Sequence, residues 1–292
     1  MAVLAFGLFL VLHGLTAATG SGFSSTVAGE LIVGALLIIS FGILEKRMSF
    51  PSLDLFMFSR RVLAASISAA FLQALASYAV LFIIIMYLQG SRGLSPFDAS
   101  LLLIPGYVLG GIVGPFAGRL SDKFGARILA SIGLTFQILG ILIYSTLSLN
   151  TPYIFIIVGA IFNGVGASMF FPANNSAVMA STPKRAYGVA SGVLRTLSNT
   201  GMVSSFAVAL FIASMSIPRQ MAFTIFLGFG QISGSQLSQA FVDGMHSALL
   251  VSILLLSVAL IFSIVRGKEE NNRGGKTRSR ENGRWQLYIE GV

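Results

Sequence analysis

A short run of charged residues at 118–127 combines one acid with three bases between two apolar segments. Its polar and glycine positions are Gly118, Arg119, Asp122, Lys123, Gly125 and Arg127. A carboxylate at the start of a helix can accept hydrogen bonds from the unsatisfied backbone amides and favour the helix dipole. We therefore expect Asp122 at the N-terminus of a helix over 128–148. The run predicts either an element that takes part in conformational change or a basic anchor with a helix cap.

Glycines recur at every fourth position in the segment before this run. Gly106, Gly110 and Gly114 lie on one ridge of a helix, and Gly188 and Gly192 repeat the spacing further along the chain. Small residues at this spacing let a neighbouring helix approach closely, which is a main source of association between helices in lipid. The pattern favours tight packing, either as a fixed contact or as faces that move between two arrangements.

A few polar side chains interrupt otherwise apolar stretches. Gln73 and Tyr78 lie near the middle of 62–88, and Asn163 lies near the middle of 152–171. Such residues either line a cavity or form hydrogen bonds between helices. In a third segment, Arg195 and Asn199 are further candidates to line the cavity. Arg195 is expected to face protein or water, or to extend to lipid headgroups. Gln137 is interpreted as structural.

The elements that position these residues are apolar segments long enough to span a membrane. Hydrophobic residues make up 55% of the 292 residues and charged residues only 10%, whereas about 25% charged residues is ordinary in soluble domains. A spanning helix needs ~20 largely apolar residues. Eight segments meet or approach this length: 2–19, 29–44, 62–88, 99–117, 128–148, 152–171, 189–215 and 245–265. Since the alternating pattern of membrane strands is absent, the sequence predicts an all-α polytopic membrane bundle of about eight helices.

The basic residues indicate the orientation of this bundle. Most of the 19 Lys and Arg residues fall in every second connection and after the last segment. By the positive-inside rule these positions are cytoplasmic, so both termini are expected in the cytoplasm of a cell-membrane protein. The net charge of +9 is thus explained by topology, and no nucleic-acid partner is expected.

The sequence lacks the residues that several kinds of catalytic and metal-binding chemistry require. The chain has no cysteine and only two histidines, which excludes thiol catalysis and thiolate metal sites. His13 and His246 are interpreted as local hydrogen-bonding residues. No phosphate-binding loop or nucleophile with a base is visible, so we expect no enzyme, no metal and no cofactor.

Three stretches together resemble one transporter family. GRLSDKFGAR, at 118–127, is similar to the signature loop between the second and third helices of a six-helix half in the major facilitator superfamily. YLQGSRGLSP at 87–96 and LIPG at 103–106 resemble the corresponding region of its fourteen-span drug:proton antiporters of the EmrB/QacA type. The resemblance implies export of small amphipathic or drug-like solutes coupled to proton influx, with the first and fourth helices of the half lining the cavity.

The position of the signature loop implies a domain organisation. By resemblance, 1–45 holds two linker helices, 46–61 is a cytoplasmic linker, 62–265 is the C-terminal six-helix half, and 266–292 is a basic cytoplasmic tail. The N-terminal half, with the proton-coupling carboxylates, is then expected to be absent from this chain. A separate N-terminal half or a second copy of the chain would complete the transporter. A non-transporting scaffold or truncated remnant is the remaining alternative.

Overall fold

The computed structural model describes residues 24–47, 61–216 and 235–266, together with scattered positions between 3 and 17. Within these ranges every regular element is a helix. Residues 48–60 of the predicted linker, the tail after 266 and most of the first segment lie outside the described residues.

The helices follow the predicted order. They are α2 (Ser25–Arg47), α3 (Arg61–Met86) with its π-helical extension η2 (Tyr87–Ser91), α4 (Pro96–Phe124), α5 (Ala126–Tyr144), α6 (Tyr153–Ala180), the short η3 (Lys184–Ala186), α7 (Tyr187–Ser216) and α9 (Ser235–Val265). Five of them, α3 to α6 and α9, are long and apolar enough to cross a membrane. This confirms the all-α polytopic bundle that the composition predicts.

Several helices extend beyond the apolar segments that predict them. The segment 99–117 becomes α4, which ends at Phe124, and 152–171 becomes α6, which continues through Pro172 to Ala180. Hydropathy marks only the part of a helix that can lie in lipid, whereas the hydrogen-bonded helix continues until a residue stops it. Gly125 stops α4, since its φ of 92° is in a region that favours glycine.

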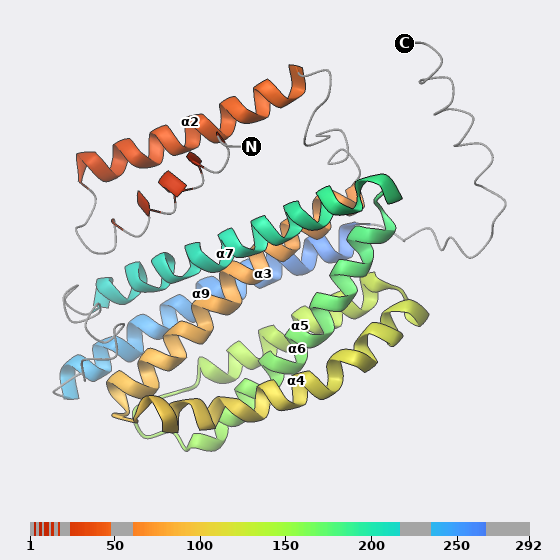
Figure 1. The fold of residues 1–292 in the computed structure, drawn as a ribbon. Helices are drawn as coiled ribbons and strands as arrows, with labels where there is room; N and C mark the ends of the chain where they lie inside the picture. Colours follow the sequence, from red (N-terminus) through yellow and green to blue (C-terminus); the bar gives the residue numbers. More distant parts are fainter. Residues whose placement is uncertain are drawn as a thin grey trace, which may run out of the picture.

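The six helices from α3 to α9 pack in two groups (Figure 1). The most extensive contacts join α6 to α5 and to α4, followed by those joining α3 to α7 and to α9. We can match α3, α4 and α5 in order with α6, α7 and α9. The contacts of α6 with α5 and α4 then correspond to the contacts of α3 with α9 and α7. Each triplet has three helices, so the second triplet starts on the opposite side of the membrane. The bundle therefore has the contact pattern of an inverted repeat.

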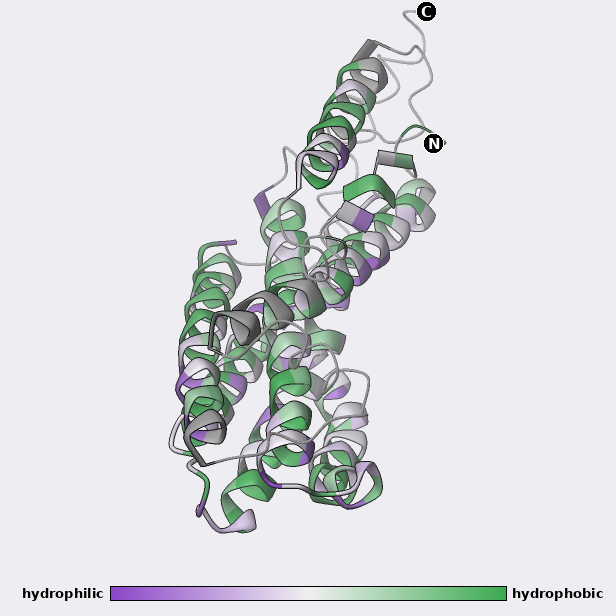
Figure 2. Ribbon diagram, turned by 90° about the vertical axis from the view of Figure 1, so that its left-hand side faces the viewer, coloured by the Kyte–Doolittle hydropathy of each residue, from purple (hydrophilic) through white to green (hydrophobic). Residues whose placement is uncertain are grey.

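Hydrophobic residues run along the helices of the bundle (Figure 2), and many of the large apolar side chains are exposed. On α9, Leu250, Leu254 and Ile261 are 60%, 63% and 55% exposed and share one face. A water-soluble protein rarely exposes so continuous an apolar surface. This surface fits a protein surrounded by lipid.

Candidate functional site

The framework of the site is a close crossing of α4 and α6. A Cβ atom added at Gly110 would lie 2.8 Å from the Gly164 carbonyl oxygen, and one at Gly106 would overlap the backbone of Ala160. Both positions therefore require glycine at this backbone separation. The crossing uses the predicted ridge on α4 and places Tyr107 beside α6.

The remaining predicted glycines have a different environment. A Cβ atom added at Gly114, Gly118, Gly188 or Gly192 would meet nothing within 4 Å in the described structure. The ridge is thus packed toward the N-terminal end of α4 and open toward its C-terminal end. That Gly114, Gly188 and Gly192 pack closely against a helix stays a prediction. It would concern a contact with a helix outside the described structure.

A second close crossing, between α5 and α6, was missed by the sequence analysis. A Cβ atom at Gly133 would lie 2.6 Å from the Gly166 oxygen, and one at Gly140 would lie 2.9 Å from the Gly159 oxygen. Gly133 and Gly140 are seven residues apart, which is also a spacing of one helix face. This spacing is the signal that could have identified the crossing. The two crossings hold α6 at the centre of its three-helix group.

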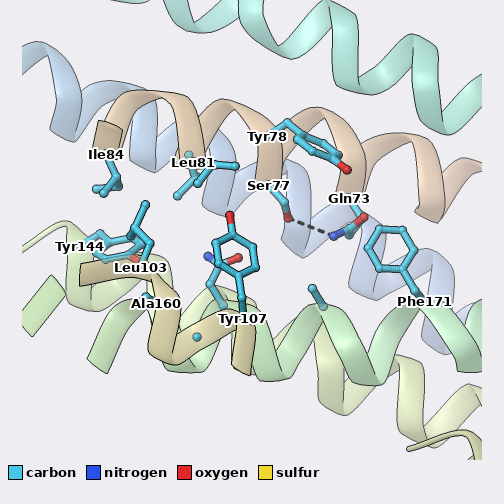
Figure 3. Close-up of a pocket in the computed structure, with 15 residues that line it drawn as sticks. Gln73, Ser77, Tyr78, Leu81, Ile84, Leu103, Tyr107, Tyr144, Ala160 and Phe171 are labelled. Atoms are coloured by element: carbon cyan, nitrogen blue, oxygen red, sulfur yellow. Dashed lines mark hydrogen bonds between the residues drawn. The ribbon is translucent and has the colours of Figure 1, made fainter. Parts of the chain in front are cut away.

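A cavity of about 190 Å³ opens between α3, α4 and α6. It brings together three predicted residues, Gln73 and Tyr78 of α3 and Asn163 of α6. Figure 3 shows Gln73 and Tyr78 on the same side of the cavity. Its remaining described lining is Ser77, Val80, Leu81, Ile84, Leu103, Gly106, Tyr107, Tyr144, Ala160, Gly164, Ala167 and Phe171. The lining is therefore mostly apolar and aromatic, with a few neutral polar groups.

A buried hydrogen-bond network fixes the polar wall of this cavity. Gln73 Nε2 donates to Gln137 Oε1 at 2.9 Å and to Ser77 Oγ at 3.1 Å, while Ser77 Oγ donates to the same Gln137 oxygen at 2.6 Å. Gln137 is fully buried on α5. It is structural, as interpreted, but its partners are cavity residues. Gln73 both lines the cavity and bonds to another helix, so its two predicted roles coexist.

Aromatic residues that the sequence analysis did not single out form the opposite wall. Tyr107 of α4 extends toward Ser77, and Tyr144 of α5 lies at the end near Ile84 (Figure 3). Phe171 closes the end near Gln73. Tyr107 directly follows Gly106, so its position next to a glycine ridge was the available signal.

Arg195 and Asn199 lie elsewhere. Both side chains are exposed on α7, and neither lines the cavity. They share a helix face with the open positions Gly188 and Gly192.

The charged run differs from its predicted geometry at Asp122. We expected Asp122 at the N-terminus of the following helix, but α4 continues through this position to Phe124, and Gly125 is the N-cap residue of α5. That expectation was wrong because no residue before Gly125 interrupts the helical backbone. The Asp122 side chain lies outside the described part of the chain.

The bases of the same run lie at the surface. Arg119 is exposed and Arg127 is partly exposed. The Lys123 ammonium lies 5.5 Å from the centre of the Phe124 ring. A role of this run in conformational change is not tested by these positions and stays a prediction.

Buried polar contacts also join the helices at both ends of the lobe. At one end, Arg266 is 2% exposed, and its Nη1 donates to Ser66 Oγ of α3 at 3.1 Å and to Asn174 Oδ1 of α6 at 3.3 Å. Asn174 Nδ2 in turn donates to the Ser66 carbonyl oxygen at 3.0 Å. The sequence analysis assigned Arg266 to the tail, because its charge alone gives no sign of burial.

At the opposite end, three side chains hold the connection between α5 and α6. Tyr87 Oη donates to the Ser148 oxygen at 2.6 Å, Arg92 Nη1 to the Thr151 oxygen at 2.9 Å, and His246 Nε2 to the Leu147 oxygen at 2.8 Å. Burial opposes the Arg92 charge, but the neighbouring Tyr153 and Tyr87 hydroxyls outweigh this effect and raise the pKa of Arg92. The guanidinium therefore stays charged. His246 acts as a local hydrogen-bonding residue in this arrangement.

The other histidine contacts an acid. His13 Nδ1 lies 2.9 Å from Glu30 Oε2 of α2, and both side chains are partly exposed. Among the described residues, no three His, Cys, Asp or Glu side chains are grouped closely enough to hold a metal ion.

Comparisons with known proteins identify a family that this chain matches and several proteins that are similar to it. The chain matches the family described as Major Facilitator Superfamily over residues 1–206 and 66–284. It is 30% identical over 198 residues to the uncharacterized MFS-type transporter YhcA of Bacillus subtilis, covering 66% of this chain and 37% of that protein.

Two further relatives have names that refer to drugs. The lincomycin resistance protein LmrB of Listeria monocytogenes is 26% identical over 87% of this chain and 53% of its own length. The multidrug efflux pump LfrA of Mycolicibacterium smegmatis is 29% identical over 69% of this chain and 40% of its own length. The chain thus spans about half or less of the length of these relatives.

Proposed function

Because the chain belongs to the Major Facilitator Superfamily, we propose that residues 62–265 form one six-helix lobe of a transporter that exports small amphipathic solutes. The lobe works with a second lobe in the cell membrane, and export is coupled to proton influx. Both termini of the chain lie in the cytoplasm. The lincomycin resistance protein and the multidrug efflux pump among the relatives support this class of solute.

The cavity between α3, α4 and α6 is the observation that carries the proposal. Aromatic rings and neutral polar groups from several helices converge there, including Tyr78, Tyr107 and Asn163. Its volume of about 190 Å³ is below the roughly 300–1,000 Å³ of pockets that enclose drug-sized ligands. The lobe therefore supplies one wall of the solute site, and the second lobe supplies the other.

The open faces of α4 and α7 support such a second lobe. Gly114 on α4 and Gly188 and Gly192 on α7 have free space where a side chain would be, so another helix can approach them closely. Arg195 is exposed on the same face of α7, and an arginine at the centre of a span costs ~2.5–3.5 kcal/mol on insertion scales. A protein surface or an aqueous path that covers this face removes most of that cost.

Proton coupling requires an ionisable group in the membrane. The described residues that line the cavity include no acid or histidine. We place the coupling carboxylates in the second lobe. The C-terminal part of α4 that contains Arg119, Asp122 and Lys123 is then the element that changes its contacts as the two lobes move.

Everted vesicles from an efflux-deficient host test this function. One host expresses the chain together with the genomic segment upstream of its gene, a second the chain alone, and a third the segment alone. The first vesicles should accumulate an amphipathic dye when their interior is acidified, and nigericin should abolish the accumulation. Equal accumulation with the chain alone would favour a self-pairing transporter. Accumulation that is unchanged by nigericin would contradict proton coupling.

A further inference from the structure

The charge of the cavity lining restricts what can bind there. All of the described side chains around the cavity are neutral. An ion that leaves water without a counter-charge loses far more solvation energy than a neutral molecule does. The cavity wall in this lobe therefore favours an uncharged group of the solute over a cation or an anion.

The shape of the lining favours a flat ring. Tyr78, Tyr107, Tyr144 and Phe171 come from four different helices and surround the space on several sides (Figure 3). Aromatic side chains prefer offset-stacked or edge-to-face contacts with other rings. A cavity of about 150 Å³ can hold benzene, so one of about 190 Å³ has room for a ring system of one to two fused rings.

Two amides of the lining have unused hydrogen-bonding capacity. Gln73 is 1% exposed, and its Oε1 atom has no hydrogen-bond partner in the described structure. Its nitrogen is held by Gln137 and Ser77, so the oxygen is the atom left to accept. Nδ2 of Asn163 likewise has no partner among the described residues and remains as a donor.

These atoms are closed to water in the present conformation, and both residues line the cavity. Buried polar atoms are costly to leave without partners. A ligand that offers a donor to Gln73 and an acceptor to Asn163 would remove this cost.

We propose that the cavity selects neutral, planar heteroaromatic groups that carry a hydrogen-bond donor next to an acceptor, as in cyclic amides. This inference rests on the proposed function, because it names the chemical class of the solute at the same site. The aromatic walls hold the ring, Gln73 accepts from its N–H group, and Asn163 donates to its carbonyl oxygen.

Three probes of similar size separate the interactions. Quinolin-2-one has the donor and the acceptor, its N-methyl derivative lacks the donor, and 1-methylquinolinium is a cation. Equilibrium dialysis measures their binding to the full chain in lipid nanodiscs. Quinolin-2-one should bind about tenfold more tightly than either alternative, the factor expected for one unmet buried hydrogen bond. Equal binding of the neutral probes, stronger binding of the cation, or no binding of quinolin-2-one at millimolar concentration would overturn the inference.

A change of one side chain tests the assignment to this cavity. Asn163→Asp keeps the shape of the side chain but replaces the donor by an acid, so quinolin-2-one binding should weaken and 1-methylquinolinium binding should strengthen, each by about tenfold. Asn175→Asp is the matched control, since Asn175 is exposed on the same helix and does not line the cavity. An equal response of both variants would overturn the inference. Dye transport in vesicles is measured separately, so active transport with no preference for neutral rings would reject the solute class and leave the transporter in place.

Discussion

Gln137 of α5 accepts a hydrogen bond from Gln73 of α3 at 2.9 Å, and both side chains are almost completely buried. The two helices have few other direct contacts. This bond therefore links α5, which packs with α4 and α6, to a cavity-lining residue of α3, which packs with α7 and α9. It also determines which atom of the Gln73 amide remains available at the cavity.

Replacement of Gln137 by leucine should destabilise the lobe. The change leaves Gln73 Nε2 and Ser77 Oγ without their common acceptor, and an unsatisfied buried polar group costs about 1–3 kcal/mol. Thermal unfolding of the detergent-solubilised chain measures the effect as a lower Tm. Gln239→Leu is the matched control, because Gln239 is exposed on α9. A similar Tm for both variants would show that the buried network contributes no stability.

Gly110→Ala and Gly114→Ala should have opposite effects although they lie on the same ridge. A methyl group at Gly110 would approach the Gly164 oxygen to 2.8 Å, and overpacking of this kind typically costs about 1–3 kcal/mol. At Gly114 the methyl group meets open space, so alanine should be neutral or stabilise the helix by up to about 1 kcal/mol. Thermal unfolding of the two variants in the same detergent, without a chemical denaturant, compares their stabilities directly. Equal losses of stability would contradict the division of the ridge.

The sequence predicts the spanning helices well because each depends on a local property. An apolar stretch from 62 to 88 must be helical in lipid to satisfy its backbone, whatever its neighbours are. The glycine ridge and the polar positions Gln73 and Asn163 are also visible as interruptions of an apolar pattern. Their common cavity is consistent with the family resemblance, which associates their two helices.

The contacts between distant residues are not visible in the sequence. Tyr107 lines the cavity because the crossing at Gly106 places it beside α6. Arg266 is the first residue after α9 and resembles the basic tail that follows, yet it is buried between Ser66 and Asn174. Helix ends are similarly undetermined by hydropathy, which is why Asp122 was placed in the wrong helix.

Arg266→Lys should weaken the end of the lobe that contains this residue. The planar guanidinium donates to Ser66 of α3 and Asn174 of α6 from one nitrogen, whereas a lysine ammonium has a different reach and donor geometry. Hydrogen bonds of charged groups contribute about 1.5–3 kcal/mol, so we expect a lower Tm and faster proteolysis near residue 266. Arg195→Lys, on the exposed face of α7, should leave both quantities unchanged in the isolated chain. Indistinguishable behaviour of the two variants would exclude a structural role for the buried contact.

Asp122→Ala should slow transport without preventing membrane insertion. In the proposed two-lobe transporter, the C-terminal end of α4 that contains Asp122 changes its contacts during each cycle. Loss of the carboxylate should therefore reduce dye accumulation in everted vesicles by about tenfold, equivalent to ~1.4 kcal/mol in the barrier. The amount of inserted protein, measured by immunoblotting of washed membranes, should stay the same. Asp243→Ala is the control, because Asp243 is exposed near the opposite end of the lobe on α9. Normal accumulation by Asp122→Ala would reduce the charged run to a membrane anchor, and loss of the inserted protein would indicate a role in folding instead of transport.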